Sequence, residues 1–157
     1  PYITNEKSLK QVHQMRAEYS VILTTTETIL EDDPRLDCRL EEGSNPNIVI
    51  LGKREIPTTA KMWQIGDREI VQFATLDEFL VSDNYTQIDS IMTECGAQMN
   101  TLLLKQGLVN EIRMFVAPKI LGNKEKKSFS MAVNLQDFEL TDVQNLDGDL
   151  CQYFLRR

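Results

Sequence analysis

The sequence has few of the residues on which several common protein functions depend. Its three cysteines, Cys38, Cys95 and Cys151, are widely spaced and form no Cys-x-x-Cys pair. This pattern argues against a disulfide framework and a zinc cluster, and it favours a reducing compartment such as the cytoplasm. The single histidine, His13, and the lack of a Gly-x-Ser-x-Gly motif argue against a hydrolase with a catalytic triad. We expect His13 to lie on a solvated helix face.

Charge and hydropathy argue against two further classes of partner. The formal net charge is −7 and no basic stripe is visible, which argues against nucleic-acid binding. No apolar run approaches the roughly 20 residues that span a bilayer, so no membrane partner is expected. The 157 residues, of which 41% are hydrophobic, predict a single domain over residues 1–157. Because the chain enters a helix-start signal almost directly after Pro1, we expect native residues upstream of it to be missing.

Hydrophobic periodicity and turn residues predict alternating helices and strands. Helices are expected at residues 6–18 after Asn5, 27–31 after Thr26, 76–80 after Thr75 and 97–106 before Gly107. Strands are expected at residues 20–23, 47–51, 69–73, 88–93, 111–117, 138–143 and 150–155, with the Asp147-Gly148 turn joining the last two. This order predicts an α/β fold: a mixed, mostly parallel sheet with helices on both faces and a C-terminal antiparallel hairpin. Ligands in such sheets gather at the carboxyl ends of the parallel strands.

A glycine turn at residues 94–96 is the first candidate site. Gly96 lies between an apolar strand and a helix, whose first N–H groups are unpaired and favour an anion such as a pyrophosphate. A lone glycine at such a turn also suits plain chain reversal.

A polar run at residues 28–39, Thr-x-x-x-Asp-Asp-Pro-x-Leu-x-x-Arg, is the second candidate site. It places a hydroxyl, two carboxylates and a guanidinium beyond the end of a strand, which suits a sugar or nucleotide. Asp33 before Pro34 equally suits simple helix termination. Arg16 is able to pair with a phosphate, and Lys53 and Arg54 with the extra phosphate of a phosphorylated dinucleotide, although solvated charges are the alternative for all three.

Three runs together resemble a known family, the reductase domain of the bifunctional riboflavin biosynthesis enzyme RibD. They are ITNEKSLKQVHQMRAEYSVILTTTETILEDDPRLDCR at 3–39, NIVILGKREIP at 47–57 and IDSIMTECGAQMNTLLLKQGLVNEIRMFVAPKILG at 88–122. The resemblance implies a fold like that of dihydrofolate reductase. It also implies reduction by NADPH of 5-amino-6-(5-phosphoribosylamino)uracil to the ribitylamino form, with hydride transferred to ribosyl C1′ of the ring-opened imine.

The resemblance also implies roles for individual residues. Cofactor contacts are expected from Thr28, Asp32, Gly52, Gly96, Ala97, Gln98, Met99, Asn100, Thr101 and Leu102. Substrate contacts are expected from Arg16, Leu36, Arg39 and Glu94. Glu94 is also the candidate for proton transfer, with a purely binding role as its alternative. Tyr2 stands where the family usually has a tryptophan, and no metal is expected.

The sequence departs from the family pattern at several positions. We expect the strand that precedes Pro1 in the family to be missing from this chain. Gly52 stands where serine or another small polar residue is common in the family, and Cys95 where glycine or alanine is usual. Two alternatives therefore stay open: a diverged NADPH reductase of a pterin or another substrate, and a non-catalytic relative. The resemblance also points to a homodimer, with the C-terminal strands as a candidate interface.

Overall fold

The computed structural model describes residues 3–39, 42–120, 122 and 129–157. The chain folds into two compact units. One unit contains residues 13–96 and the other contains residues 1–12 and 97–157. Tyr2, which stands where the family usually has a tryptophan, lies outside the described residues.

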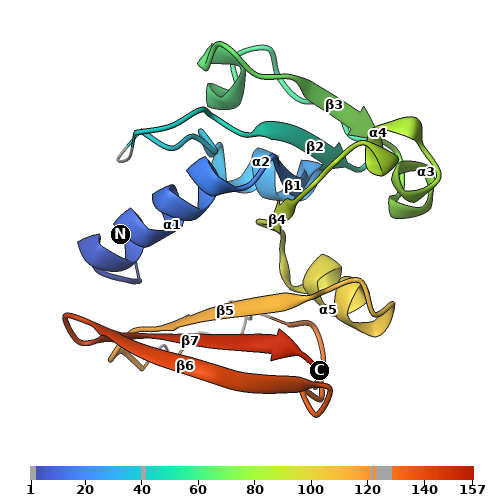
Figure 1. Cartoon of the computed structure of the whole chain (residues 1–157). Coiled ribbons are helices and arrows are strands. Elements are labelled where there is room, and N and C mark those ends of the chain that lie inside the picture. The colour runs from blue at the N-terminus through green and yellow to red at the C-terminus, as the bar shows by residue number, and fades with distance from the viewer. Residues whose placement is uncertain (1–2, 40–41, 121, 123–128) are drawn as a thin grey trace. The chain divides into compact units, whose positions relative to one another are not determined.

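The unit of residues 13–96 is built on a parallel sheet. Its strands are β1 (Val21–Thr25), β2 (Asn47–Leu51), β3 (Ile70–Phe73) and β4 (Ile91–Thr93), in the order β3-β2-β1-β4 (Figure 1). The chain therefore adds β2 and β3 on one side of β1 and then returns to place β4 on its other side. This reversal makes the carboxyl ends of β1 and β4 a topological switch point, where open α/β sheets bind ligands.

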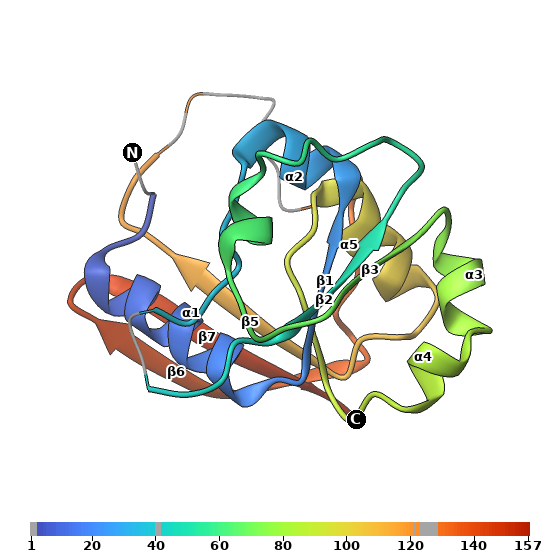
Figure 2. The ribbon, with the colours of Figure 1, turned by 90° about the horizontal axis from the view of Figure 1, so that it is seen from above.

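Short helices follow the strands of this unit. They are α2 (Thr26–Asp32), the 3-10 helix η1 (Lys61–Gln64), α3 (Leu76–Leu80) and α4 (Asp83–Thr86). The hydroxyl of Thr25 caps α2 by accepting the N–H of Thr28 at 3.2 Å. Thr75 and Ser82 cap α3 and α4 in the same way. Figure 2 shows α3 and α4 next to each other beyond the end of β3.

One hydrophobic core cluster of this unit lies on one face of the parallel sheet. It is a cluster of Ile22, Ile29, Leu36, Ile48, Ile50, Ile56, Ala60 and Met62. The strands contribute β-branched side chains, which pack well on a pleated surface. The helix α2, the loop after it and η1 supply the covering side chains, so core packing fixes the segment that carries the polar run.

Helix α1 (Glu6–Glu18) crosses the boundary between the units, which falls between Val12 and His13. Asn5 caps it by accepting the N–H of Ser8 at 3.0 Å, as the sequence predicted. At the same end, the carboxylate of Asp149 accepts the N–H of Asn5 and the hydroxyl of Ser8, each at 2.7 Å. These bonds lower the pKa of Asp149.

The second unit contains α5 (Ala97–Lys105) and an antiparallel sheet of β5 (Glu111–Val116), β6 (Phe138–Leu146) and β7 (Asp149–Arg156), in the order β5-β7-β6. Gly107, at φ 70°, follows α5 in the left-handed conformation that often ends helices. Asp147 and Gly148 join β6 to β7 with φ values of 53° and 98°. Positive φ at both central residues is typical of two-residue hairpins whose strands keep their twist.

The α/β class, the mostly parallel sheet with flanking helices and the C-terminal antiparallel hairpin are confirmed. Several element bounds differ from the expectation: β4 begins at Ile91 rather than at residue 88, β6 continues to Leu146 rather than ending at residue 143, and α4 was not expected. Two further differences concern the sheets and the start of α2. The strands form two sheets rather than one mixed sheet, and α2 begins at Thr26 with Thr25 as its cap because β1 continues through Thr25. Within the described ranges, no helix is both long and apolar enough to cross a membrane.

Candidate functional site

The switch point of the parallel sheet places Glu94 directly beyond β4 and next to β1. The N–H of Glu94 donates to the carbonyl of Leu23 at 2.9 Å, and the hydroxyl of Thr24 donates to the carbonyl of Glu94 at 2.8 Å. Thr24 is fully buried, so this bond also satisfies a hydroxyl in the core. The backbone of Glu94 is therefore fixed on both sides by β1.

The side chain of Glu94 forms a bidentate ion pair with Arg16, in the last turn of α1. Arg16 Nε lies 2.6 Å from Glu94 Oε1, and Arg16 Nη2 lies 2.7 Å from Glu94 Oε2. Both side chains are largely shielded from solvent, with 12% and 22% exposure. Such planar pairing fixes the orientation of both groups. Two residues assigned to the substrate by resemblance therefore meet in the structure.

The loop after α2 adds a second set of charges beside this pair. Arg35, Asp37 and Arg39 alternate along the loop, and both arginines donate to the carboxylate of Asp37. Arg16 also donates through Nη1 to the carbonyl of Asp37 at 3.1 Å. Burial alone would raise the pKa of Asp37, but the hydrogen bonds from the two arginines hold it below its ordinary value.

A fourth guanidinium, that of Arg68, binds the backbone of the same loop. It donates to the carbonyl of Leu36 at 2.8 Å and to the carbonyl of Arg35 at 2.8 Å. We call the group of Arg16, Arg35, Arg39 and Arg68 with Asp37 and Glu94 the arginine cluster. It contains four guanidinium groups and two carboxylates, and so has an excess of positive charge in a chain whose net charge is −7.

The structure corrects the expectation that His13 is solvated. His13 is fully buried, and neither ring nitrogen makes a hydrogen bond of standard geometry with the described residues, although the backbone of Asp37 interacts with the ring. Its pKa is lowered by burial and by the nearby charges of Arg16 and Arg39, while Asp37 acts in the opposite direction. The sequence suggested a solvated residue because one histidine among polar helix residues gives no signal of which face is covered.

The expected cofactor residues Thr28, Asp32 and Gly52 lie at or near the carboxyl ends of β1 and β2. Thr28 is in the first turn of α2, with its hydroxyl 3.0 Å from that of Thr25, and Asp32 is exposed at the end of α2. Gly52 has φ 128°, and a Cβ atom built on it would lie 2.3 Å from the hydroxyl of Thr26. This close approach explains why glycine stands there.

The turn at Gly96 is open. Gly96 is exposed, and a Cβ atom built on it would meet nothing within 4 Å. Helix α5 begins at the next residue, Ala97, so the N–H groups of its first turn lack intrahelical acceptors. Gly96 ends one unit and Ala97 begins the other. The residues fit the expected anion at this helix start, and the phosphate contact itself stays a prediction.

Within α5, two of the expected cofactor residues differ in their surroundings. The hydroxyl of Thr101 donates to the carbonyl of Ala97 at 2.8 Å and accepts the N–H of Ser130 at 2.9 Å. Thr101 is buried, so its side chain serves the packing of its own unit, whereas Leu102 is exposed. The predicted roles of Gln98, Met99 and Asn100 likewise stay predictions.

Four further residues of the candidate segments have environments that bear on the chemistry open to them. The side chain of Leu36 is buried in the core cluster, so a ligand would reach this residue through its backbone. Burial, and then the neighbouring Glu94, raise the pKa of the Cys95 thiol to about 12, which excludes a thiolate nucleophile near neutral pH. Lys53 and Arg54 are exposed after β2.

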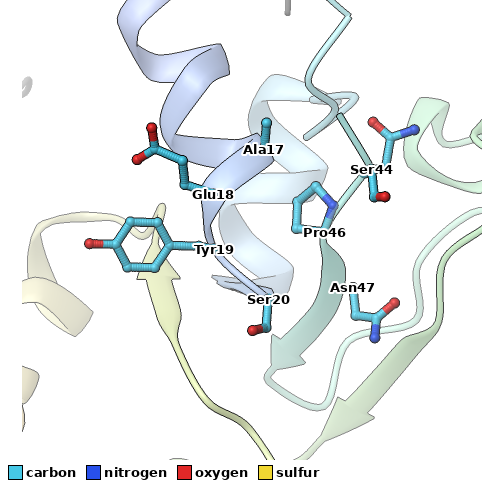
Figure 3. Close-up of a pocket in the computed structure, with 8 residues that line it drawn as sticks. Ala17, Glu18, Tyr19, Ser20, Ser44, Pro46 and Asn47 are labelled. Atoms are coloured by element: carbon cyan, nitrogen blue, oxygen red, sulfur yellow. The ribbon is translucent and has the colours of Figure 1, made fainter. Parts of the chain in front are cut away.

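A separate recess of about 250 Å³ lies at the opposite, amino-terminal edge of the sheet (Figure 3). It is lined by the end of α1 and the starts of β1 and β2, including Ala17, Ser20 and Pro46. It contains none of the residues in the arginine cluster. Across the described part of the chain, no group of three or more His, Cys, Asp or Glu side chains is placed to hold a metal ion.

Sequence reasoning missed Arg35, Asp37 and Arg68 as members of the site. A signal for the first two was present, because Arg35, Asp37 and Arg39 alternate within the polar run. Nothing in the sequence indicated Arg68, which reaches the loop from 32 positions away.

Comparison with known proteins identifies the family to which this chain is similar. Residues 2–152 match the RibD C-terminal domain. Riboflavin biosynthesis protein RibD of Mycobacterium tuberculosis is 31% identical over 95% of this chain, and the match covers 46% of that protein. The 5-amino-6-(5-phosphoribosylamino)uracil reductase of Buchnera aphidicola is 27% identical, over 80% of this chain and 78% of its own length.

The fold has solved counterparts. The RibD structure of Acinetobacter baumannii superposes with a TM-score of 0.81 at 23% identity, covering all of this chain and 52% of that one. The chain thus spans about half the length of this structure, and less than half of the RibD relative from Mycobacterium tuberculosis. Because residues 2–152 match the RibD C-terminal domain, the chain belongs to the RibD C-terminal domain family.

Proposed function

We propose that the chain is an NADPH-dependent reductase that converts 5-amino-6-(5-phosphoribosylamino)uracil to its ribitylamino form. The observation that carries this proposal is the arginine cluster at the switch point of the sheet. Arg16 links the carboxylate of Glu94 to the backbone of Asp37, and Asp37 in turn holds Arg39. A phosphate monoester carries about two negative charges near neutral pH. The positive excess of the cluster matches that charge.

The roles of Arg39, Arg16 and Glu94 follow from their geometry. Arg39 is partly exposed, at 41%, and has donors beyond those that Asp37 accepts, so it binds the substrate phosphate. Glu94 and Arg16 orient each other, and the carboxylate of Glu94 faces the substrate as a binding group. Proton transfer by Glu94 is the alternative, because its ion pair with Arg16 holds the carboxylate in a fixed direction.

NADPH, when bound, supplies the hydride. The protein groups proposed to hold it are Thr28, Asp32, the backbone at Gly52, and the first turn of α5 after Gly96. Lys53 and Arg54 lie exposed after β2, where either is able to pair with the additional phosphate that distinguishes NADPH from NADH. Cys38 and Cys151 are buried thiols, which suits the proposed cytoplasmic location.

Calorimetric titration with NADPH and NADH tests the cofactor. We expect micromolar binding of NADPH with a clear preference over NADH. A double substitution Lys53→Ala and Arg54→Ala removes most of that preference while leaving NADH affinity unchanged. Turnover of the phosphorylated pyrimidine in the presence of NADPH then tests the activity. Binding of NADPH without turnover favours a diverged reductase of another substrate, such as a pterin, and failure to bind either nucleotide favours a non-catalytic relative.

A homodimer is the second part of the proposal, and the antiparallel sheet supplies a surface for it. Residues i and i+2 of a strand share a face, and the strand register places eight apolar residues on one face of this sheet: Ile112, Met114, Val116, Phe138, Leu140, Val143, Leu150 and Phe154. The polar residues Asn145, Gln152 and Arg156 lie on the same face. Val116, Leu140, Val143 and Leu150 are exposed. A largely apolar face of this kind is typical of an interface. We call it the apolar sheet face.

A further inference from the structure

Arg68 joins three backbone carbonyls that belong to two different segments. Its Nη1 donates to Leu36 at 2.8 Å, and its Nη2 donates to Arg35 at 2.8 Å and to Met62 at 2.7 Å. Arg68 precedes β3, whereas Met62 lies in η1 and Leu36 in the loop after α2. One planar guanidinium therefore connects the loop to the 3-10 helix and to the edge of the parallel sheet.

The loop that Arg68 binds has an unusual backbone. Leu36 has φ 53° and Asp33 has φ 43°, so two residues other than glycine adopt the left-handed conformation within four positions. Asp33 does so as the C-cap of α2. Leucine seldom adopts this conformation, since its side chain offers no local hydrogen bond in return, and surrounding contacts must hold it there.

Two kinds of contact hold Leu36. Its side chain is buried in the core cluster, and its carbonyl accepts the bond from Arg68. The three consecutive carbonyls of residues 35, 36 and 37 are each bound by a guanidinium from elsewhere in the chain, the first two by Arg68 and the third by Arg16. The orientation of these peptide groups sets the direction in which Asp37 and Arg39 project.

We propose that Arg68 is a positioning residue that holds the 35–39 loop in the conformation required for phosphate binding. Arg68 acts through the backbone: with its three bonds in place, Leu36 stays left-handed and Asp37 keeps Arg39 beside Arg16. Loss of these bonds lets the loop relax, and the arginine cluster loses its geometry without losing Arg16 or Arg39. The ligand in this proposal rests on the proposed function, whereas the structural role of Arg68 does not.

The variant Arg68→Met tests this role, because it keeps much of the aliphatic stem and removes all five donors. Lys61→Met is the matched control, since it removes a cation near the same loop whose ion pair with Asp33, at 3.5 Å, is exposed. Calorimetry of the full chain with ribose 5-phosphate and with NADPH is the first measurement. We expect Arg68→Met to weaken ribose 5-phosphate binding by about tenfold or more and NADPH binding by less than about twofold. Lys61→Met should change neither.

Amide hydrogen exchange at Cys38 is the second measurement, and it requires no ligand. The N–H of Cys38 donates to Asn45 Oδ1 at 3.1 Å, so its protection reports on the loop. We expect Arg68→Met to speed this exchange by about tenfold, while amides of Ile48 and Ile50 in β2 keep their rates. Unchanged exchange at Cys38 would overturn the proposal, and so would faster exchange throughout the unit, which indicates general destabilisation.

The variant Arg68→Lys separates the effect of the donor geometry from the effect of the charge. It also provides the test if Arg68→Met does not fold. A lysine keeps the charge as a compact ammonium that does not reproduce the rigid fork of donors. We expect it to restore neither ribose 5-phosphate affinity nor Cys38 protection in full, and full restoration would overturn the proposal. If the unmodified chain fails to bind ribose 5-phosphate, the phosphate assignment of the proposed function is wrong. Exchange at Cys38 then still decides the role of Arg68.

Discussion

Arg16 and Glu94 form a bidentate ion pair although 78 positions separate them in the sequence. The pair connects the last turn of α1 to the carboxyl end of β4, and the remaining terminal nitrogen of Arg16 donates to the carbonyl of Asp37. One side chain therefore brings the two candidate segments of the sequence, the turn at 94–96 and the polar run at 28–39, into a single arrangement. Single substitutions in this arrangement, each compared with a matched control substitution, can therefore separate the roles of its residues.

Replacement of Arg39 by alanine should weaken binding of the phosphorylated substrate by about 1.5 to 3 kcal/mol, because a charge-assisted pair is lost. NADPH binding should be unchanged. Arg35→Ala is the matched control: Arg35 and Arg39 both pair with Asp37, and both side chains are 41% exposed. Titration of both variants with ribose 5-phosphate and NADPH measures the difference. Equal losses from the two variants would show that the effect arises from Asp37 and would contradict direct contact by Arg39.

Replacement of Gly52 by alanine should destabilise the fold by about 1 to 3 kcal/mol. The added Cβ atom would lie 2.3 Å from Thr26 Oγ1, and φ at this position is 128°, which residues with a side chain rarely adopt. Gly66→Ala is the control, since a Cβ atom there meets nothing within 4 Å. Urea unfolding of both variants provides the measurement. Equal stability of the two variants would refute the close packing of Gly52 on Thr26.

Stability should fall with acidification below about pH 6.5 because of His13. Burial lowers the pKa of His13 in the folded state, and the charges of Arg16 and Arg39 lower it further. The unfolded chain therefore takes up a proton that the folded chain does not bind, and the free energy of unfolding decreases as the pH falls through 6.5 toward the lower folded-state value. Asp37 acts in a lower pH range, since its stabilising effect is lost only as the pH falls below its ordinary value of 3.8.

Urea unfolding at about pH 7.5 and at about pH 5.5, on either side of the ordinary histidine pKa, checks this dependence. His13→Gln, which removes the only histidine, should reduce the difference between the two pH values whatever its effect on absolute stability. A variant with the same difference as the unmodified chain would show that His13 is not the group responsible.

Replacement of Val143 by arginine should convert the proposed dimer to a monomer. Val143 lies on the apolar sheet face, where a buried guanidinium without a partner opposes association. Val81→Arg is the control, because Val81 is exposed in the other unit, after α3. Light scattering coupled to size exclusion measures the mass of each. A monomeric unmodified chain would refute the dimer, and a dimeric Val143→Arg variant would place the interface elsewhere.

The sequence alone determined the local elements and the family. Helix α1 with its Asn5 cap, strand β2, helix α3 with its Thr75 cap and the Asp147-Gly148 turn all lie where the sequence predicted them. These features depend on spacing, capping and backbone preferences within a few residues. The three runs that resemble RibD likewise depend only on residue order, and the match over residues 2–152 confirms them.

Only the tertiary structure decided which polar side chains meet. The burial of His13, the pairing of Arg16 with Glu94 and the bonds from Arg68 to Arg35 and Leu36 join segments far apart in the chain. The division of the strands into two sheets is also a property of long-range pairing. Local periodicity indicates whether a residue lies in a helix or a strand. It does not indicate which distant group covers that residue, because this depends on how the elements pack.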